Sequence, residues 1–339
     1  MPLGGAPGAR ALPLGREVDR AGPLRGSSLL YHGMTFSGLA NGRDIDGHST
    51  TVISLGEDHA RAPSPAIPAT EPGPETQAAL PDEPSPGDQL FLTIRGTRVR
   101  YVAVGRGKPL LLLHGWGTSL DAFADLTRDL GRFFRVTAFD FPGHGHSELP
   151  SATWTVDDFV GLTLELMADL GVERPSIIAH SFGGRVAIKL AAARPEAVNR
   201  LVLVDSAGVP PQRTVGRVVR RAASRFANAA GRRLGQPGQA IRRAIVRRIA
   251  SPDYLNAGPL RDTFLAIVKE DLRPDLRRIA CPTLLVWGEA DEDTPLSDAR
   301  TMARLIPNAR LLVLKNAGHF SYLDQYGRFR LAVMPFLDA

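Results

Sequence analysis

The 339-residue sequence has one cysteine, Cys281. A single thiol cannot form an intramolecular disulfide or a multi-cysteine metal site, which excludes the disulfide-rich secreted class. Cys281 is followed within two residues by the apolar run "TLLVW". We therefore expect a small buried side chain at the start of a strand.

Long apolar runs are also missing. No run approaches the roughly 18 residues that a membrane-spanning helix needs, and the N-terminus has no apolar segment of signal-peptide type. Aromatic residues make up only 6% of the chain and are sparse among the arginines, which argues against nucleic-acid binding. The sequence predicts a cytoplasmic protein without a nucleic-acid partner.

Acidic residues are absent from residues 209–251, which contain 11 arginines. In "QAIRRAIVRRIAS" the apolar residues recur at helical spacing and arginines fill the positions between them. Three interpretations stay open. The apolar stripe covers the active site and the arginines are simply solvated, or the arginines contact an anionic membrane, or they contact an acidic partner such as a carrier protein. The oligomeric state is also open.

Periodic patterns are lacking in the first 88 residues. Residues 61–88 contain 8 prolines, and residues 1–60 are glycine-rich without a clear period. Such composition does not build a packed core. We expect residues 1–88 to be a disordered extension rich in proline and glycine.

From residue 89 onward the pattern changes. Residues 89–105 alternate apolar and polar side chains on both sides of Gly96, which predicts a two-stranded hairpin. Six continuous apolar runs follow, with helical segments between them, as in a parallel sheet covered on both faces. The runs span 109–115, 134–140, 176–181, 200–206, 283–289 and 309–315.

These elements predict an α/β fold with a mostly parallel eight-stranded sheet. About 75 residues separate the fourth run from the fifth, far more than one crossover needs. We expect a core formed by residues 89–208 and 281–339, with a helical cap inserted as residues 209–280.

Ser181 stands at a sharp joint in "SIIAHSFGGRVAI", between an apolar run and a helical segment. A strand-to-helix turn of this kind exposes a nucleophilic hydroxyl next to a helix N-terminus, and it requires small residues two positions before and after the serine. Ala179 and Gly183 meet this requirement, although alanine replaces the usual first glycine. Ser181 is therefore the candidate nucleophile.

A serine nucleophile needs a base and an acid that orients the base. Of eight histidines, His319 follows the last apolar run, in "NAGHFSYLD". Asp291 follows the preceding run and Asp205 the one before it. Both aspartates suit the orienting role, and the Ser–Asp–His order favours Asp291.

An oxyanion hole needs two backbone N–H groups. Phe182 follows the nucleophile, and Trp116 lies between Gly115 and Gly117 after the first parallel strand. We predict that these two residues donate the two bonds.

Five segments in this order resemble the α/β-hydrolase fold superfamily over roughly residues 89–339. They are "LLLLHGWG", "DFPGHGHS", "AHSFGGRVA", "LLVWGEADEDTP" and "NAGHFSYLD". The resemblance implies a helical cap, no cofactor and no metal, with Ser181, Asp291 and His319 as catalytic triad and Trp116 and Phe182 as oxyanion donors. A serine nucleophile disfavours haloalkane dehalogenases and epoxide hydrolases. The "HGWG" loop is similar to that of esterases acting on pimeloyl esters of acyl carrier protein, which keeps an acidic carrier open.

The expected function is hydrolysis of a small-molecule carboxylic ester through an acyl-enzyme on Ser181, with water as second substrate. Alternatives on the same triad are a carbon–carbon bond hydrolase, a cofactor-free perhydrolase, or a ligand-binding receptor that retains the triad. The predicted substrate pocket includes Phe226, Leu255, Phe264 and Phe320.

Overall fold

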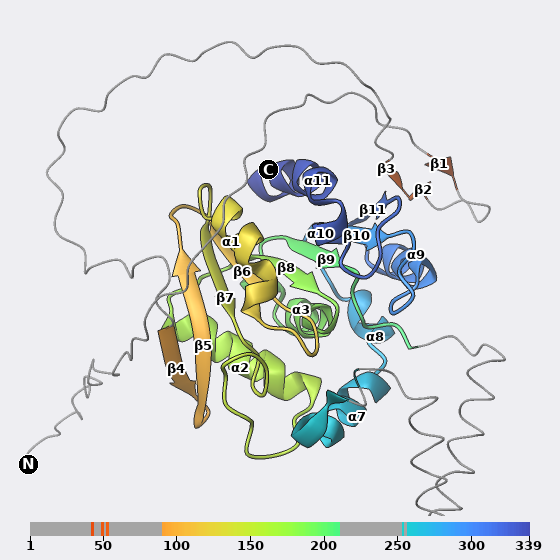
Figure 1. The fold of residues 1–339 in the computed structure, drawn as a ribbon. Helices are drawn as coiled ribbons and strands as arrows, with labels where there is room; N and C mark the ends of the chain where they lie inside the picture. The colour runs from red at the N-terminus through yellow and green to blue at the C-terminus, as the bar shows by residue number, and fades with distance from the viewer. Residues whose placement is uncertain (1–41, 44–48, 51, 54–89, 211–252, 254–255) are drawn as a thin grey trace, which may run out of the picture.

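The computed structural model describes residues 42–43, 49–50, 52–53, 90–210, 253 and 256–339 (Figure 1). Nearly all of the arginine-rich segment 209–251 lies outside the described residues. The three interpretations of its arginines are therefore not tested by the structure. The predicted pocket residues Phe226 and Leu255 lie outside the described residues too.

One nine-stranded sheet forms the centre of the described molecule, in the order β3-β11-β10-β9-β8-β6-β7-β5-β4 (Figure 1). β5 runs antiparallel to β4 and β7, and all other neighbours are parallel. The predicted α/β class and its eight strands, β4 to β11, are confirmed. These strands are β4 (Leu90–Ile94), β5 (Thr97–Val104), β6 (Pro109–Leu113), β7 (Arg135–Phe139), β8 (Ser176–His180), β9 (Leu201–Val204), β10 (Thr283–Gly288) and β11 (Ala309–Leu314).

The ninth strand comes from the N-terminal extension. β3 (Val52–Ile53) pairs in parallel with Leu311 and Leu312 of β11, and β1 (Gly42–Arg43) and β2 (Ser49–Thr50) form a separate antiparallel pair. Six residues of the extension thus form short strands. The edge of β11 offers unpaired backbone groups that even a two-residue strand can use.

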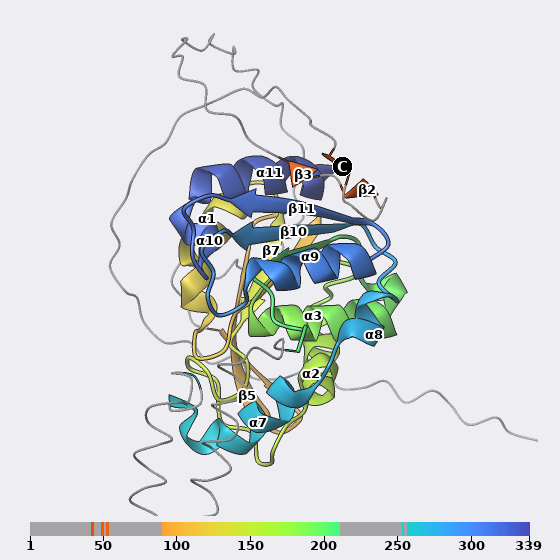
Figure 2. The same cartoon turned by 90° about the vertical axis from the view of Figure 1, so that its right-hand side faces the viewer.

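Helices cover both faces of the sheet (Figure 2). Side chains alternate along each buried strand, so Leu111 and Leu113 of β6 pack into one cluster while Leu110 and Leu112 pack into another. The first cluster contains the buried faces of α2, α3, α8 and α9, and the second those of α1, α10 and α11. The helices are η1 (Leu120–Phe123), α1 (Ala124–Leu130), α2 (Val156–Asp169), α3 (Phe182–Ala193), η2 (Pro195–Ala197), η3 (Gly258–Leu260), α7 (Arg261–Lys269), α8 (Arg273–Leu276), α9 (Leu296–Leu305), α10 (Ser321–Asp324) and α11 (Tyr326–Asp338).

In the described ranges no helix is both long and apolar enough to cross a membrane. α2 begins at a capping box, in which the Thr155 N–H donates to Asp158 Oδ2 at 2.8 Å. The buried Cys281 lies just before β10, as predicted.

The last segments of the predicted cap, residues 209–280, pack against the core. α7 lies below the sheet in Figures 1 and 2, where Thr263 Oγ1 accepts a hydrogen bond from the Trp154 N–H. Ile267 of α7, Leu272 and Leu276 are all buried in the cluster around α3. The end of the predicted cap therefore belongs to the packing of the core, because α8 fills the space between α3 and α9.

Candidate active site

Ser181 occupies the joint between β8 and α3. Its φ of 50° and ψ of −111° lie in a region that residues with a side chain rarely adopt, which is the strained backbone expected for an exposed nucleophile. The N–H groups of the first turn of α3 are beside the hydroxyl, where they favour developing negative charge. The local geometry agrees with the elbow predicted from the sequence.

The residues around Ser181 are small because each lies close to a different neighbour. A Cβ on Gly183 would come within 2.2 Å of the Leu113 carbonyl oxygen, and one on Gly184 within 1.9 Å of Ser206 Oγ. Gly183 must therefore be small because α3 starts against the backbone of β6. Ala179 is fully buried in the core, paired with Leu113.

His319 connects Ser181 to Asp291. Its Nε2 is 3.0 Å from Ser181 Oγ, and its Nδ1 is 2.9 Å from Asp291 Oδ2. The structure thus brings together all three residues that the sequence assigns to a triad. In this geometry a proton can pass from the hydroxyl to Nε2 while the carboxylate holds Nδ1–H.

Hydrogen bonds fix the Asp291 carboxylate. Thr294 Oγ1 lies 2.6 Å from Oδ2, and the N–H groups of Asp293 and Thr294 each donate to Oδ1 at 2.9 Å. Burial acts to raise the pKa of Asp291, but the bonds from His319 and Thr294 outweigh it and lower the pKa. Thr294 was not foreseen in this role; its only sequence signal is its place three residues after the aspartate.

The pKa of His319 changes in the opposite direction. Burial acts to lower this pKa, but the hydrogen bond and charge of Asp291, followed by the charge of Asp293, outweigh it and raise the pKa. The site therefore stabilises an imidazolium, which is the species that forms when Ser181 loses its proton.

Asp205, the other candidate acid, has different partners. Its fully buried carboxylate accepts from the Gly288 N–H at 2.8 Å and from the Ser321 N–H at 3.0 Å. Burial raises its pKa to about 7. Asp205 ties the end of β10 to the loop that carries His319, whereas Asp291 contacts the imidazole itself.

The predicted oxyanion donors flank Ser181. Phe182 is the first residue of α3, whose N–H has no partner within the helix. A Cβ on Gly115 would lie 3.3 Å from Ser181 Cβ, so the Gly115–Trp116 backbone is next to the nucleophile. Among the described residues no backbone carbonyl accepts from the Trp116 N–H.

Aromatic rings surround this position. The Trp116 ring lies 5.5 Å from that of Phe182, 5.2 Å from Phe264 and 4.7 Å from His144. Phe264 therefore lies beside the predicted oxyanion donor Trp116, while Phe320 packs on His180 and His319. His144 was not predicted to be here; only its place in the "FPGHGHS" turn hinted at it.

His180 supports the His319 loop. Its Nε2 is 2.7 Å from the His319 carbonyl oxygen, to which it donates. Burial lowers the pKa of His180 to about 3, so the ring is neutral. Nothing in the sequence indicated that His180 holds the backbone of the base.

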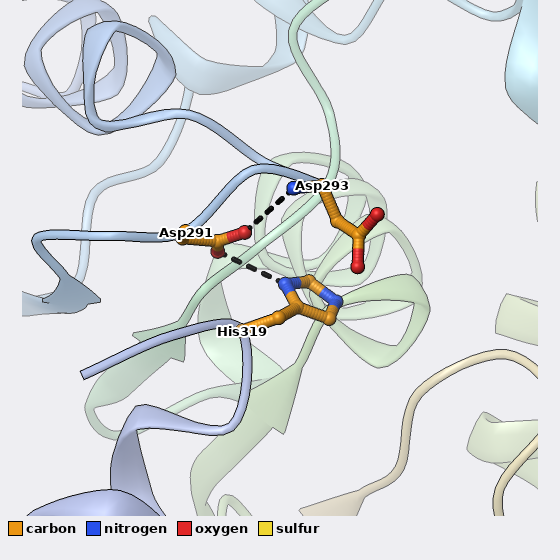
Figure 3. Close-up of side chains that lie close together, drawn as sticks. All are labelled: Asp291, Asp293 and His319. Carbon is orange, nitrogen blue, oxygen red and sulfur yellow. Dashed lines mark hydrogen bonds and ion pairs between the residues drawn. The ribbon is translucent and has the colours of Figure 1, made fainter.

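Asp293 adds a second carboxylate beside the imidazole (Figure 3). Donor atoms of Asp291, Asp293 and His319 all lie within 4.8 Å of one another, a spacing that could hold a metal ion. A cation would have to compete with the donors of Asp291, since both of its oxygens already accept hydrogen bonds. The donor set therefore suits proton transfer better than metal binding.

Comparison with known proteins agrees with this geometry. The profile of the family described as "Alpha/beta hydrolase family" matches residues 110–330. Pimeloyl-[acyl-carrier protein] methyl ester esterase of Nitrosomonas europaea is 32% identical over 248 residues, 67% of this chain and 94% of its own. The 2-hydroxymuconate semialdehyde hydrolase of a Pseudomonas strain is 28% identical, over 71% of this chain and 91% of its own.

Among solved structures, the enol-lactonase from Burkholderia xenovorans aligns with a TM-score of 0.58 at 26% identity. The alignment covers 74% of this chain and all of the lactonase. The names of these relatives give them different substrates, so the reaction of this chain has to be argued from its own site.

Proposed function

Because the chain belongs to the alpha/beta hydrolase family, we propose that it cleaves carboxylic esters through an acyl-enzyme on Ser181. The observation that carries the proposal is the unbroken chain from Ser181 Oγ through His319 to Asp291, with steps of 3.0 and 2.9 Å. A hydroxyl with a neutral imidazole in hydrogen-bond reach is an activated nucleophile.

The proposed reaction has two halves. His319 Nε2 takes the Ser181 proton as Oγ attacks the acyl carbon, and it then gives that proton to the departing alkoxide, which leaves as the alcohol. Water enters next, loses a proton to the same Nε2, and attacks the acyl carbon. The acid leaves and Ser181 regains its proton. Asp291 remains ionised throughout and stabilises the imidazolium.

The negative oxygen of each tetrahedral intermediate needs donors. We assign this role to the N–H groups of Trp116 and Phe182, as the sequence predicts. Their support is the position of the Gly115–Trp116 backbone beside Ser181 and of Phe182 at the start of α3. Removing one such donor typically costs roughly 100-fold to 1,000-fold in kcat.

The surroundings favour an apolar acyl or alkyl group. The Trp116 ring lies 5.5 Å from that of Phe182 and 5.2 Å from that of Phe264, and aromatic walls bind apolar groups by excluding water. The similarity to a pimeloyl methyl ester esterase supports an ester with an acyl chain of several carbons.

A panel of p-nitrophenyl esters with graded acyl lengths tests the proposal. We expect steady turnover, with kcat/KM rising from acetate to medium chains. The absence of steady turnover across the panel would contradict ester hydrolysis and favour the receptor interpretation. Turnover only in the presence of hydrogen peroxide would point to a perhydrolase.

The similarity to 2-hydroxymuconate semialdehyde hydrolase favours one second candidate, carbon–carbon bond hydrolysis on the same triad. Assaying 2-hydroxymuconate semialdehyde beside the esters separates the two. A kcat/KM for this compound above that of every ester would select the second candidate.

We further propose that the protein is cytoplasmic. We also propose that its arginine-rich cap contacts an anionic membrane or an acidic carrier. The ester panel repeated with anionic vesicles tests the membrane contact. Unchanged rate and partitioning would remove it.

A further inference from the structure

The loop between β6 and η1, residues 114–119, converges on one carbonyl oxygen. His114 Nδ1 lies 2.7 Å from the Gly115 oxygen, Thr118 Oγ1 donates to it at 2.9 Å, and the Thr118 N–H reaches it at 3.4 Å. Three donors on a single backbone oxygen are more than the turn itself requires. The orientation of this one peptide group is therefore strongly fixed.

The contacts of His114 determine its tautomer. Its Nε2 accepts the Phe141 N–H at 2.9 Å, so the ring proton must be on Nδ1, which then donates to the Gly115 oxygen. The ring is 1% exposed, and burial lowers its pKa to about 3. His114 is a neutral link between the turn after β7 and this loop, and its one ring N–H is bonded to the Gly115 oxygen.

The same peptide group carries the Trp116 N–H. In a planar trans peptide the C=O and the following N–H point in opposite directions. Donors that hold the Gly115 oxygen on one side therefore aim the Trp116 N–H to the other. Gly115 lies against Ser181, where an added Cβ would be 3.3 Å from Ser181 Cβ.

The far end of the loop is held as well. The fully buried Asp140 accepts the Leu120 N–H at 2.7 Å through Oδ1 and the His146 N–H at 2.8 Å through Oδ2. With both ends attached to the turn after β7, the loop cannot rotate its peptide groups freely. The bonds to the Gly115 oxygen then fix the orientation of the Gly115–Trp116 peptide group.

We propose that His114 and Thr118 are positioning residues, which hold the Gly115 carbonyl so that the Trp116 N–H points at the oxyanion. The inference rests on the proposed function, because it assumes an oxyanion on an acyl group bound to Ser181. Both side chains bond to the Gly115 carbonyl oxygen, so each acts through the Gly115–Trp116 peptide.

Thr118→Val tests the role of the hydroxyl, since it removes the donor and keeps the shape. We expect kcat to fall about 10-fold or more with KM nearly unchanged, because the bond serves the transition state rather than substrate binding. Thr118→Ser restores the donor and should recover most of the kcat. Thr301→Val is the matched control: Thr301 Oγ1 also donates to a carbonyl at 2.9 Å, but on α9.

Two substitutions of His114 separate its two bonds. Asn places an amide N–H near the position of Nδ1 and can keep the bond to Gly115, whereas Gln places an amide near Nε2 and can keep the bond to Phe141. The inference predicts a higher kcat for His114→Asn than for His114→Gln, at matched thermal stability. Equal values, or the reverse order, would contradict it.

The rate of labelling by a fluorophosphonate distinguishes the possible failures. A wild-type protein that neither turns over esters nor reacts contradicts the proposed function and, with it, the inference. A reactive wild type whose Thr118→Val variant keeps the wild-type kcat and labelling rate contradicts the inference alone. Slower labelling of Thr118→Val, recovered by Thr118→Ser, supports both.

Discussion

Asp205 and Asp291 are buried carboxylates that follow neighbouring strands, yet their hydrogen bonds give them different tasks. Asp291 accepts Nδ1–H of His319, while Asp205 accepts two backbone N–H groups, those of Gly288 and Ser321. The first contact orients the base and the second holds two loops together.

Asparagine at each position should therefore have a different effect. Asp291→Asn keeps the size but favours the wrong tautomer of His319, so we expect kcat to fall by about 10⁴-fold with little loss of stability. Asp205→Asn sets an amide against one of the two N–H groups and should cost about 1–3 kcal/mol of unfolding free energy. Urea denaturation and ester kinetics on both variants check this. A larger loss of kcat for Asp205→Asn, at matched stability, would exchange the two roles.

The charge of Asp293 should appear in the pH profile. Its carboxylate helps raise the pKa of His319, and the base works only when neutral, so kcat/KM rises with pH as His319 loses its proton. Asp293→Asn removes the negative charge, lowers the pKa, and should shift the acidic limb to lower pH. Glu292→Gln is the control, since the exposed Glu292 is not among the main charges acting on His319. An unmoved limb in Asp293→Asn would contradict this account.

At the scale of single residues, the sequence identified the three triad residues but not the side chains that hydrogen-bond to them. Ser181, Asp291 and His319 were found because each follows an apolar run, and such ends share one edge of a parallel sheet. Thr294 and His180 were missed because a threonine or histidine near a motif has no distinguishing pattern; only folding shows that they contact Asp291 and the His319 carbonyl.

At the scale of elements, the elbow depends on how closely α3 approaches β6. Gly183→Ala would bring a Cβ to 2.2 Å from the Leu113 carbonyl oxygen, and backbone cannot yield as a flexible side chain can. We expect the unfolding free energy to fall by about 3 kcal/mol or more, and ester turnover to be lost.

Gly327 of α11 provides the comparison. A Cβ there meets nothing within 4 Å, so Gly327→Ala should be neutral or stabilise the helix by up to about 1 kcal/mol. Equal stability of the two alanine variants in chemical denaturation would contradict the steric explanation for Gly183.

Strand prediction succeeded where the signal was long. The runs of β6 to β11 are continuous and apolar because both sheet faces are covered. β3 could not be predicted as a sheet strand, because two residues have no period and its pairing depends on the open edge of β11.

For the whole molecule, three separate segments meet at Lys189 of α3. Its ammonium contacts Asp157 of α2 at 2.6 Å and Glu270, after α7, at 2.5 Å. Arg185, one turn earlier, donates to the Glu270 carbonyl at 3.0 Å. The helix that starts at the nucleophile thus also holds the point where the predicted cap returns to the core, a link that the sequence could not reveal because its residues are about 80 positions apart.

Lys189→Met should loosen this junction. We expect about 1 kcal/mol less unfolding free energy, a modest value because Asp157 is largely exposed. Lys108→Met is the control: its ammonium and its partner Asp338 are both exposed, so no measurable change is expected. Denaturation curves that coincide for the two variants would show that Lys189 does not stabilise the junction.

The proposed activity depends on the Ser181 hydroxyl, and steady-state hydrolysis of a medium-chain p-nitrophenyl ester by the wild type and by Ser181→Ala tests it most directly. Ser297→Ala, which removes a hydroxyl from α9, is the matched control. The account predicts that kcat of Ser181→Ala falls by about 10⁴-fold or more, while Ser297→Ala retains the wild-type rate. Near-normal ester turnover by Ser181→Ala would contradict it.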